Sequence, residues 1–219
     1  MDDYMKALNR SMLFKDITDE EKREILGCLT YQMKSFKQGH VIALEGNEIR
    51  YFGVILSGSI DMIKEDLWGN RTLITRMMEG ELFGETFACG IEQQAVVSFV
   101  AAENVDVMML PFQQVIHTCS NACSFHEKLV RNLVHTIAMK NRSLMQKVEI
   151  ITKKNLREKI LAYLSIQAQM QNTRYFQIPL NRGELAQYLC ADRSALTREL
   201  TQMREEGIID FDRNTFRIY

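Results

Sequence analysis

The stretch PLNRGELAQYLCADRSALTRELTQMREEGIIDFDRNTFRIY, residues 179–219, decides the fold of the C-terminal part of this chain. Asn181 and Glu184 have the spacing of a capping box, which predicts the start of a short helix. Cys190 follows at the expected turn, and Asp192 can cap a second helix. The apolar residues at helical spacing are Leu185, Ala186 and Leu189 in the first helix and Ala195, Leu196, Leu200 and Met203 in the second.

The opposite side of the second predicted helix is cationic and rich in hydroxyl groups. No acidic residue interrupts it before Glu205, because Glu199 points to the side. Arginine reads guanine in the DNA major groove and hydroxyls reach phosphates, so this side favours a recognition helix over an ordinary solvated one. Gly207 is expected to end the helix before a β-hairpin wing over 208–211 and 215–219. The residues on this side are Arg193, Ser194, Thr197, Arg198 and Thr201.

The composition is that of a globular protein of about two domains. The 219 residues are 46% hydrophobic and 25% charged. No apolar run approaches the roughly 20 residues of a membrane span, and the acidic N-terminus lacks the core of a signal peptide. The five cysteines are thinly spread, which favours reduced thiols. We therefore expect a cytoplasmic protein without membrane contact.

The charge is distributed unevenly along the chain. From residue 150 onward there are 11 Lys/Arg against 8 Asp/Glu, whereas the remainder carries 16 against 20. The C-terminal part is thus better suited to meet a polyanion such as DNA.

The first half of the chain predicts helices followed by a glycine-punctuated β-domain. Residues 1–30 have helical spacing, with Leu8, Phe14, Ile25 and Leu29 as apolar anchors. Residues 31–111 contain short β-rich runs separated mostly by glycines, and a hairpin tip is expected at Trp68. Regular short strands with turn signals predict an antiparallel β-roll or barrel.

A long helix is expected over residues 121–153, which contain no glycine or proline. Its apolar residues alternate spacings of four and three, as in a two-stranded coiled coil, and one polar member, Asn141, can fix the register. We expect a homodimer, because a symmetric helix-turn-helix protein usually needs two half-sites. The alternative is a single helix packed on its own β-domain. The seam consists of Val130, Val134, Ile137, Asn141, Leu144, Val148 and Ile151.

The order of these parts resembles the Crp/Fnr family of bacterial transcription regulators. The resemblance rests on GELFGE (80–85) and LAQYLCADRSALTREL (185–200) and extends over the whole chain. It implies an α+β fold: an N-terminal antiparallel β-roll of the cyclic-nucleotide-binding jelly-roll type (1–120), a dimerisation helix (121–153) and a C-terminal winged helix-turn-helix (154–219). It also implies a homodimer that binds a partly palindromic operator in double-stranded DNA and contacts RNA polymerase.

The resemblance assigns the base-reading positions to Arg193, Ser194 and Arg198. The best-known members have Glu at the second position, where it accepts a hydrogen bond from cytosine; Ser194 cannot impose the same choice. Cys190 stands where the family commonly has Gly in the turn, so we expect strain there. The residues expected to contact DNA phosphates are Arg182, Thr197 and Thr201.

The residues at the positions that bind a cyclic nucleotide in relatives indicate whether this chain can bind one. In binding relatives the Glu aligned with Glu85 holds the ribose, and an Arg-Ser pair that binds the phosphate aligns with Ala95 and Val96. A Thr-Ser pair that reads the base aligns with Leu144 and Met145. We predict no cyclic-nucleotide binding, because a buried phosphate needs a cation or donors; an apolar ligand and a filled pocket both remain open. The pocket candidates are Phe83, Gly84, Glu85, Ala95, Val96, Leu144 and Met145.

Other classes of function have less support in the sequence. Cys119 and Cys123, flanked by His117 and His126, could form a redox pair or bind a soft metal, but we favour the simpler explanation that they are two small residues capping the long helix. The chain has too few cysteines in its N-terminal region for an iron–sulfur cluster, and it lacks the paired histidines of a catalytic cupin. Haem ligation by His40, His117, His126 or His135 has no sequence motif to support it. We expect no cofactor and no enzymatic activity; a protein-binding adaptor with a cupin-like sensor domain stays open.

Overall fold

The computed structural model describes residues 3–69, 71–117 and 124–219. The chain divides into two compact units, Met1–Met139 and Lys140–Tyr219. Each unit has its own apolar core, and helix α5 (Ser124–Ile151) begins in the first unit and ends in the second. The two units are described separately below.

The N-terminal helices of unit 1 form within residues 1–30, as the sequence predicts, whereas the short helices α3 (Glu85–Ala88) and α4 (Phe112–Ile116) were not predicted. Thr18 caps α2 in a capping box with Glu21, and the four expected anchors Leu8, Phe14, Ile25 and Leu29 are all buried. They join a core that also contains Leu129 and Leu133 of α5. The other helices of this unit are α1 (Asp3–Arg10), the 3-10 helix η1 (Met12–Phe14), α2 (Asp19–Cys28), α3 (Glu85–Ala88) and α4 (Phe112–Ile116).

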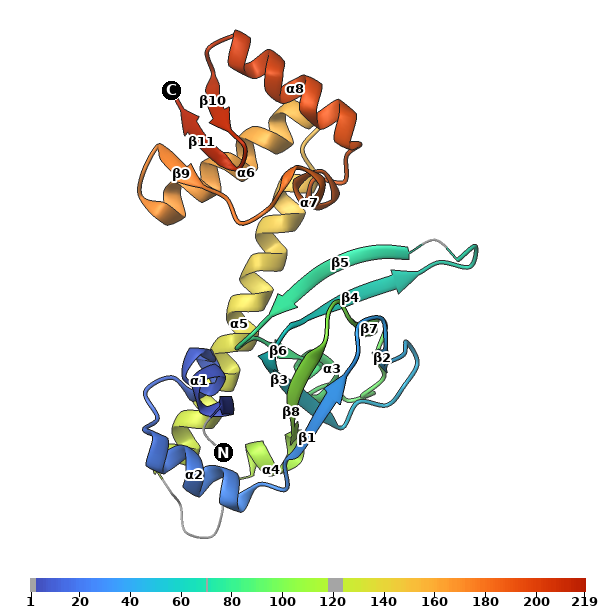
Figure 1. Cartoon of the computed structure of the whole chain (residues 1–219), viewed down its shortest axis with the longest axis vertical. Coiled ribbons are helices and arrows are strands. Elements are labelled where there is room, and N and C mark those ends of the chain that lie inside the picture. Colours follow the sequence, from blue (N-terminus) through green and yellow to red (C-terminus); the bar gives the residue numbers. More distant parts are fainter. Residues whose placement is uncertain (1–2, 70, 118–123) are drawn as a thin grey trace. The chain divides into compact units, whose positions relative to one another are not determined.

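Two four-stranded antiparallel sheets form the β-roll (Figure 1), which confirms the predicted architecture. Their strand orders are β1-β8-β3-β6 and β2-β7-β4-β5, so neighbouring strands are often far apart in sequence. The expected hairpin around Trp68 joins β4 to β5. The strands are β1 (Gln32–Phe36), β2 (Val41–Ala43), β3 (Tyr51–Ser57), β4 (Ser59–Glu65), β5 (Arg71–Met78), β6 (Leu82–Phe83), β7 (Ser98–Ala101) and β8 (Val105–Pro111).

Aromatic side chains fill part of the β-roll interior. The ring of Phe99 lies 5.7 Å from that of Phe83 and 6.1 Å from that of Phe87, in tilted and edge-on geometries that aromatic pairs favour. A Cβ atom at Gly53 would lie 2.0 Å from the Phe83 ring, so glycine is required where this ring crosses β3.

Unit 2 contains the end of α5, helices α6, α7 and α8, and a small antiparallel sheet of order β10-β11-β9. The expected wing is present as β10 and β11, and together with the β-roll it confirms the α+β fold class. The third strand, β9, was not predicted; its Phe176 is paired with Phe216 and both are buried. The elements are α6 (Leu156–Gln171), β9 (Tyr175–Gln177), α7 (Arg182–Tyr188), α8 (Arg193–Glu205), β10 (Ile209–Asp212) and β11 (Thr215–Ile218).

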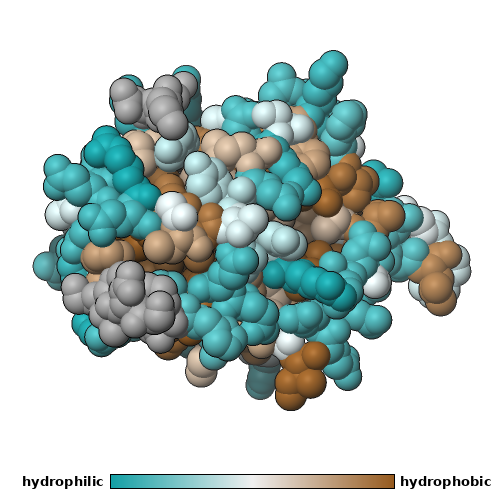
Figure 2. Space-filling model, turned by 90° about the horizontal axis from the view of Figure 1, so that it is seen from below, coloured by the Kyte–Doolittle hydropathy of each residue, from teal (hydrophilic) through white to brown (hydrophobic). Residues whose placement is uncertain are grey.

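The surface seen from below in Figure 2 is mostly hydrophilic, with hydrophobic residues in small groups between the polar ones. Among the described residues, no helix has the length and apolar character needed to cross a bilayer. Leu67 and Trp68, near the tip of the β4–β5 hairpin, are almost fully exposed.

Candidate nucleic-acid interface

Helix α7 begins at the predicted capping box. The Asn181 side chain accepts hydrogen bonds from the backbone amides of Gly183 (2.9 Å) and Glu184 (3.0 Å). The Glu184 carboxylate in turn accepts from the Asn181 amide at 2.8 Å. These bonds satisfy amide groups that the helix leaves without partners, and Leu185 and Ala186 then anchor α7 in the core of unit 2.

The turn between α7 and α8 is strained at Cys190, as expected. Its φ angle is 51°, in the left-handed region that residues with a Cβ atom rarely adopt. The turn is held by backbone bonds, since the Cys190 amide donates to Gln187 (3.1 Å) and the Ala191 amide to Ala186 (2.9 Å). The surrounding packing therefore imposes the conformation that glycine would adopt freely.

Helix α8 begins at Asp192, whose carboxylate accepts three hydrogen bonds. The backbone amides of Ser194 and Ala195 donate to Oδ1 at 2.8 and 3.0 Å, and the Ser194 hydroxyl donates to it at 2.5 Å. The hydroxyl bond is the main reason why the pKa of Asp192 lies below its usual value; the charge of Arg198 adds to the effect. The helix start is thus capped by an ionised carboxylate.

The two sides of α8 differ as the sequence predicts. Leu196, Leu200 and Met203 are fully buried in the core of unit 2. The opposite side carries the candidate DNA-contacting residues, which are not engaged by that core. Arg193, Ser194, Thr197 and Arg198 are exposed, and Thr201 is half-buried.

The two threonines on this side already use their hydroxyl protons. Thr197 donates to the Arg193 carbonyl at 2.9 Å, and Thr201 donates to the Thr197 carbonyl at 3.0 Å. Phosphate oxygens only accept hydrogen bonds, so a contact between either hydroxyl and a phosphate requires the hydroxyl to rotate away from the helix.

Arg182 packs against the wing. Its guanidinium lies 4.9 Å from the ring centre of Phe211 and 5.7 Å from that of Phe216, and it donates to the Arg213 carbonyl at 3.1 Å. Partial burial lowers its pKa. Arg204 of α8 also lies over Phe211, at 4.9 Å. Cation–π contacts of this kind join α7, α8 and the wing into one body, and a phosphate contact by Arg182 would compete with them.

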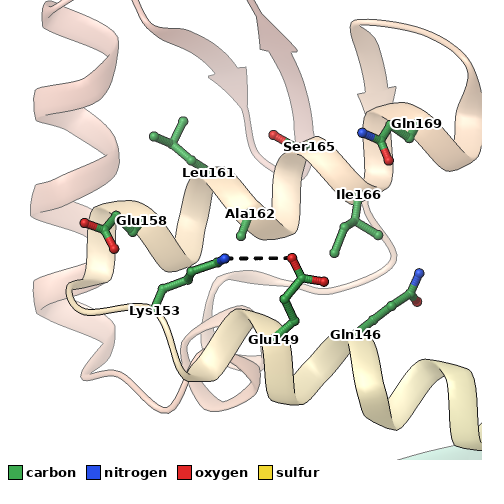
Figure 3. A pocket seen from close by; sticks show the side chains of 9 residues that line it. All are labelled: Gln146, Glu149, Lys153, Glu158, Leu161, Ala162, Ser165, Ile166 and Gln169. Carbon is green, nitrogen blue, oxygen red and sulfur yellow. Dashed lines mark ion pairs between the residues drawn. The ribbon is translucent and has the colours of Figure 1, made fainter.

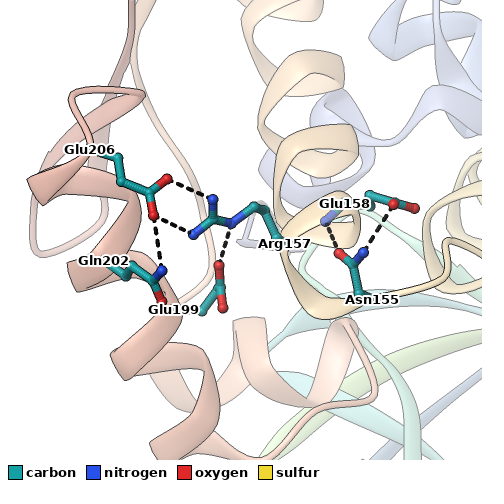
Figure 4. Close-up of polar contacts among 6 residues, drawn as sticks. All are labelled: Asn155, Arg157, Glu158, Glu199, Gln202 and Glu206. Carbon is teal, nitrogen blue, oxygen red and sulfur yellow. Dashed lines mark hydrogen bonds and ion pairs between the residues drawn. The ribbon is translucent and has the colours of Figure 1, made fainter.

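A cluster of charges ties α8 to the start of α6 (Figure 4). The Arg157 guanidinium donates to Glu199 at 2.6 Å and to the two carboxylate oxygens of Glu206 at 2.6 and 2.9 Å. Gln202 also donates to Glu206, at 2.9 Å. The bidentate contact raises the pKa of Arg157, and the same contact lowers that of Glu206. The cluster therefore holds these two acids by one shared cation, on the side of α8 that faces α6.

The sequence gives no local signal for this cluster. Arg157 is separated from Glu199 by 42 positions and from Glu206 by 49, so only the packing of α6 beside α8 brings them together.

Two domains of known families match this chain, one after the other. Residues 33–122 match the cyclic nucleotide-binding domain, and residues 158–219 match the Crp-like helix-turn-helix domain. The chain belongs to the Crp/Fnr family. Members of this family are DNA-binding transcription regulators, and unit 2 contains the Crp-like DNA-binding helix-turn-helix.

Solved structures share the Crp/Fnr fold across nearly the whole chain. The Thermus thermophilus Catabolite Activator Protein is 23% identical, with a TM-score of 0.55 over 95% of this chain and 94% of that one. The global regulator CLP of Xanthomonas campestris is 14% identical, with a TM-score of 0.64 over 92% and 99%. A CooA mutant from Carboxydothermus hydrogenoformans is 13% identical, with a TM-score of 0.67 over 95% and 91%. No curated protein sequence matches significantly.

The Crp/Fnr β-roll has a cavity of about 320 Å³ next to its aromatic interior. Of the pocket candidates, Phe83 and Gly84 line it. Glu85 is buried at the first position of α3, where its Oε1 accepts from the Thr86 hydroxyl at 3.3 Å. Ala95 is buried, whereas Val96 and, in unit 2, Leu144 and Met145 are exposed.

A groove of about 590 Å³ lies in unit 2, between the end of α5 and α6 (Figure 3). Leu161, Ala162 and Ile166 line the wall formed by α6, and Glu149 and Lys153, one helical turn apart at the end of α5, form an ion pair of 3.8 Å on the other wall. Because these opposite charges are paired within the groove, it attracts an anionic ligand less strongly than the exposed side of α8 does.

The residues considered for metal or redox chemistry do not form a site in the described part of the chain. No group of three or more His, Cys, Asp or Glu side chains is close enough there to hold a metal ion. The buried His126 ring lies 2.8 Å from the Val115 carbonyl, and His117 lies 2.6 Å from that of Gln113. Cys119 and Cys123 lie outside the described residues.

We predict that Arg157→Gln lowers the thermal unfolding midpoint of unit 2, because Glu199 and Glu206 lose their shared cation. Scanning calorimetry of the full chain measures this, with Arg174→Gln, an exposed arginine of the same unit, as the charge-matched control. The pKa of Glu206 is lowered from 4.5 in the folded state, so its contribution is present above that pH and is lost as the pH falls through the folded pKa. The difference between wild type and variant should therefore shrink in acid; a difference independent of pH, or an equal effect of Arg174→Gln, would contradict this role.

Proposed function

We propose that this protein is a homodimeric transcription regulator that reads a partly palindromic operator with the exposed side of α8. The observation that carries the proposal is the division of that helix: its apolar side is fully buried, and Arg193, Ser194 and Arg198 remain exposed in its N-terminal half. Recognition helices contact base edges mainly with their N-terminal residues. Arg193 and Arg198 suit guanine, which presents two acceptors in the major groove.

Dimerisation through α5 is supported by the exposure of part of its predicted seam. Val134, Leu144 and Val148 are 58%, 56% and 55% exposed and Asn141 is exposed as well. The other seam residues, Val130, Ile137 and Ile151, are half-buried, and Ile137 packs against the core of unit 1. The exposed apolar side chains would be stabilised if a second copy covered them. A dimer also supplies two recognition helices, one for each half-site of a palindromic operator. In the described residues the helix predicted over 121–153 is α5, Ser124–Ile151.

Control by cyclic nucleotide is not part of the proposal. The buried methyl group of Ala95 offers a phosphate no charge, and the β-roll interior is packed with Phe83, Phe87 and Phe99. Lys64 donates to the Val96 carbonyl at 2.9 Å, but its ammonium also pairs with Glu45 at 2.5 Å. A phosphate there would have to displace that carboxylate. An apolar effector and contact with RNA polymerase remain compatible with this arrangement.

Arg198→Ala should weaken binding to the selected operator by about 1–3 kcal/mol and relax base preference at one position, because one base-reading fork is lost. Fluorescence anisotropy with the operator and with a random duplex measures both effects. Arg23→Ala in α2 of unit 1 removes the same charge and should change neither. Equal weakening on both duplexes would contradict base reading, and full activity of an Arg193→Ala/Arg198→Ala protein would favour a protein-binding adaptor.

Sedimentation of the full chain at micromolar concentration should give a dimer, and Leu144→Glu should give a monomer because the coil would bury unpaired carboxylates. Ser143→Glu introduces the same charge one residue off the seam and should remain dimeric. A monomeric wild-type protein, or equal dissociation by both variants, would end the proposed dimer.

Calorimetric titration with cyclic AMP and cyclic GMP should show no saturable binding below millimolar concentration. A cyclic-nucleotide-binding member of the family, titrated in parallel, is the positive control. Saturable sub-millimolar binding would contradict the lack of a phosphate partner at Ala95 and Val96.

A further inference from the structure

The Ser194 hydroxyl is oriented by the cap of its own helix. Its oxygen lies 2.5 Å from Asp192 Oδ1, the same oxygen that accepts from the backbone amides of Ser194 and Ala195. Ser194 itself is exposed in the first turn of α8. A side chain at the reading end of the helix is therefore bound to a carboxylate on one side and open to a partner on the other.

The chemistry of the carboxylate decides where the hydroxyl proton lies. An ionised carboxylate only accepts hydrogen bonds, so the proton of Ser194 must point to Asp192. Turning the hydroxyl outward would leave two lone-pair-bearing oxygens 2.5 Å apart and would break a charge-assisted bond. What Ser194 presents to the outside is its remaining lone pairs, which can accept a hydrogen bond but cannot donate one.

The bases differ in the hydrogen-bonding groups that they present in the major groove. Cytosine presents the N4 amino group and adenine the N6 amino group, whereas guanine presents N7 and O6 and thymine presents O4, all of them acceptors. A free serine hydroxyl can satisfy either kind. A serine restricted to accepting can pair with the amino group of cytosine or adenine, and it places its oxygen against another acceptor when it faces guanine or thymine.

We propose that Asp192 makes Ser194 a specificity-determining residue that selects cytosine or adenine at the base it faces. The inference rests on the proposed DNA binding by α8. Asp192 does not touch the base; it is a positioning residue that sets the hydrogen-bonding direction of Ser194. The selectivity therefore belongs to the Asp192–Ser194 pair.

The test is selection of operators from a random duplex pool by the full-length wild-type protein and by Ser194→Ala. One position of each half-site should favour cytosine or adenine with the wild type and lose about three- to tenfold of that preference in Ser194→Ala, the loss expected for one hydrogen bond. The positions read by the arginines should keep their preferences. A wild-type preference for guanine or thymine at the changed position, or identical preferences of the two proteins, would overturn the inference.

Asp192→Gly separates the direction of the hydroxyl from the capping of the helix. Glycine is tolerated at a helix N-cap with little loss of helix stability, and it removes the oxygen to which the Ser194 hydroxyl donates. The hydroxyl is then free to donate outward. This variant should bind the operator and accept guanine or thymine at the Ser194 position; unchanged selectivity would overturn the role of Asp192.

Removing the amino group from the DNA tests the contact from the other side. Replacing the facing base with an analogue that lacks the amino group, purine for adenine or 2-pyrimidinone for cytosine, should weaken wild-type binding about three- to tenfold and leave Ser194→Ala unaffected; equal weakening of both proteins would overturn the contact. If no duplex is enriched by the wild type, the proposed DNA binding falls and this inference with it. If a duplex is enriched and Ser194→Ala leaves its preferences unchanged, only this inference falls.

Discussion

Leu196, Leu200 and Met203 hold α8 in place because all three side chains are fully buried in the core of unit 2. A helix that buries one side so completely must leave the opposite side outward, and in this chain that side carries Arg193 and Arg198. The acids on the flank of α8 are held by Arg157. Hydrophobic burial thus fixes which residues are available, and the ion cluster keeps the available side cationic.

The two units differ in how closely they keep the side chains that the family resemblance assigns to function. The helix-turn-helix has two capped helices and arginines at the expected positions, whereas its turn has a strained Cys190 in place of the usual Gly. In the β-roll, the resemblance aligns Ala95 and Val96 with the phosphate-binding pair, and aromatic rings occupy the interior. Fold similarity alone would suggest a nucleotide sensor, whereas the side chains argue against it, because function depends on the residues at the site.

Much of this structure follows from local sequence signals, and the exceptions have physical reasons. The capping box at Asn181 and the cap at Asp192 were readable because each acts within a few residues of its own helix. Strand β9 escaped prediction because it is three residues long and buries only Phe176. The Arg157 cluster depends on packing between distant segments, and the same holds for Arg182, whose stacking on the wing no sequence pattern reveals. The direction of the Ser194 hydroxyl required atomic positions.

If two copies of α8 enter neighbouring major grooves on one face of the duplex, hydroxyl-radical footprinting of the full-length protein on a selected operator will reveal it. Two protected patches related by a two-fold axis are expected, with centres about 10 base pairs, one helical turn, apart. A single patch, or two patches on opposite faces of the duplex, would contradict it.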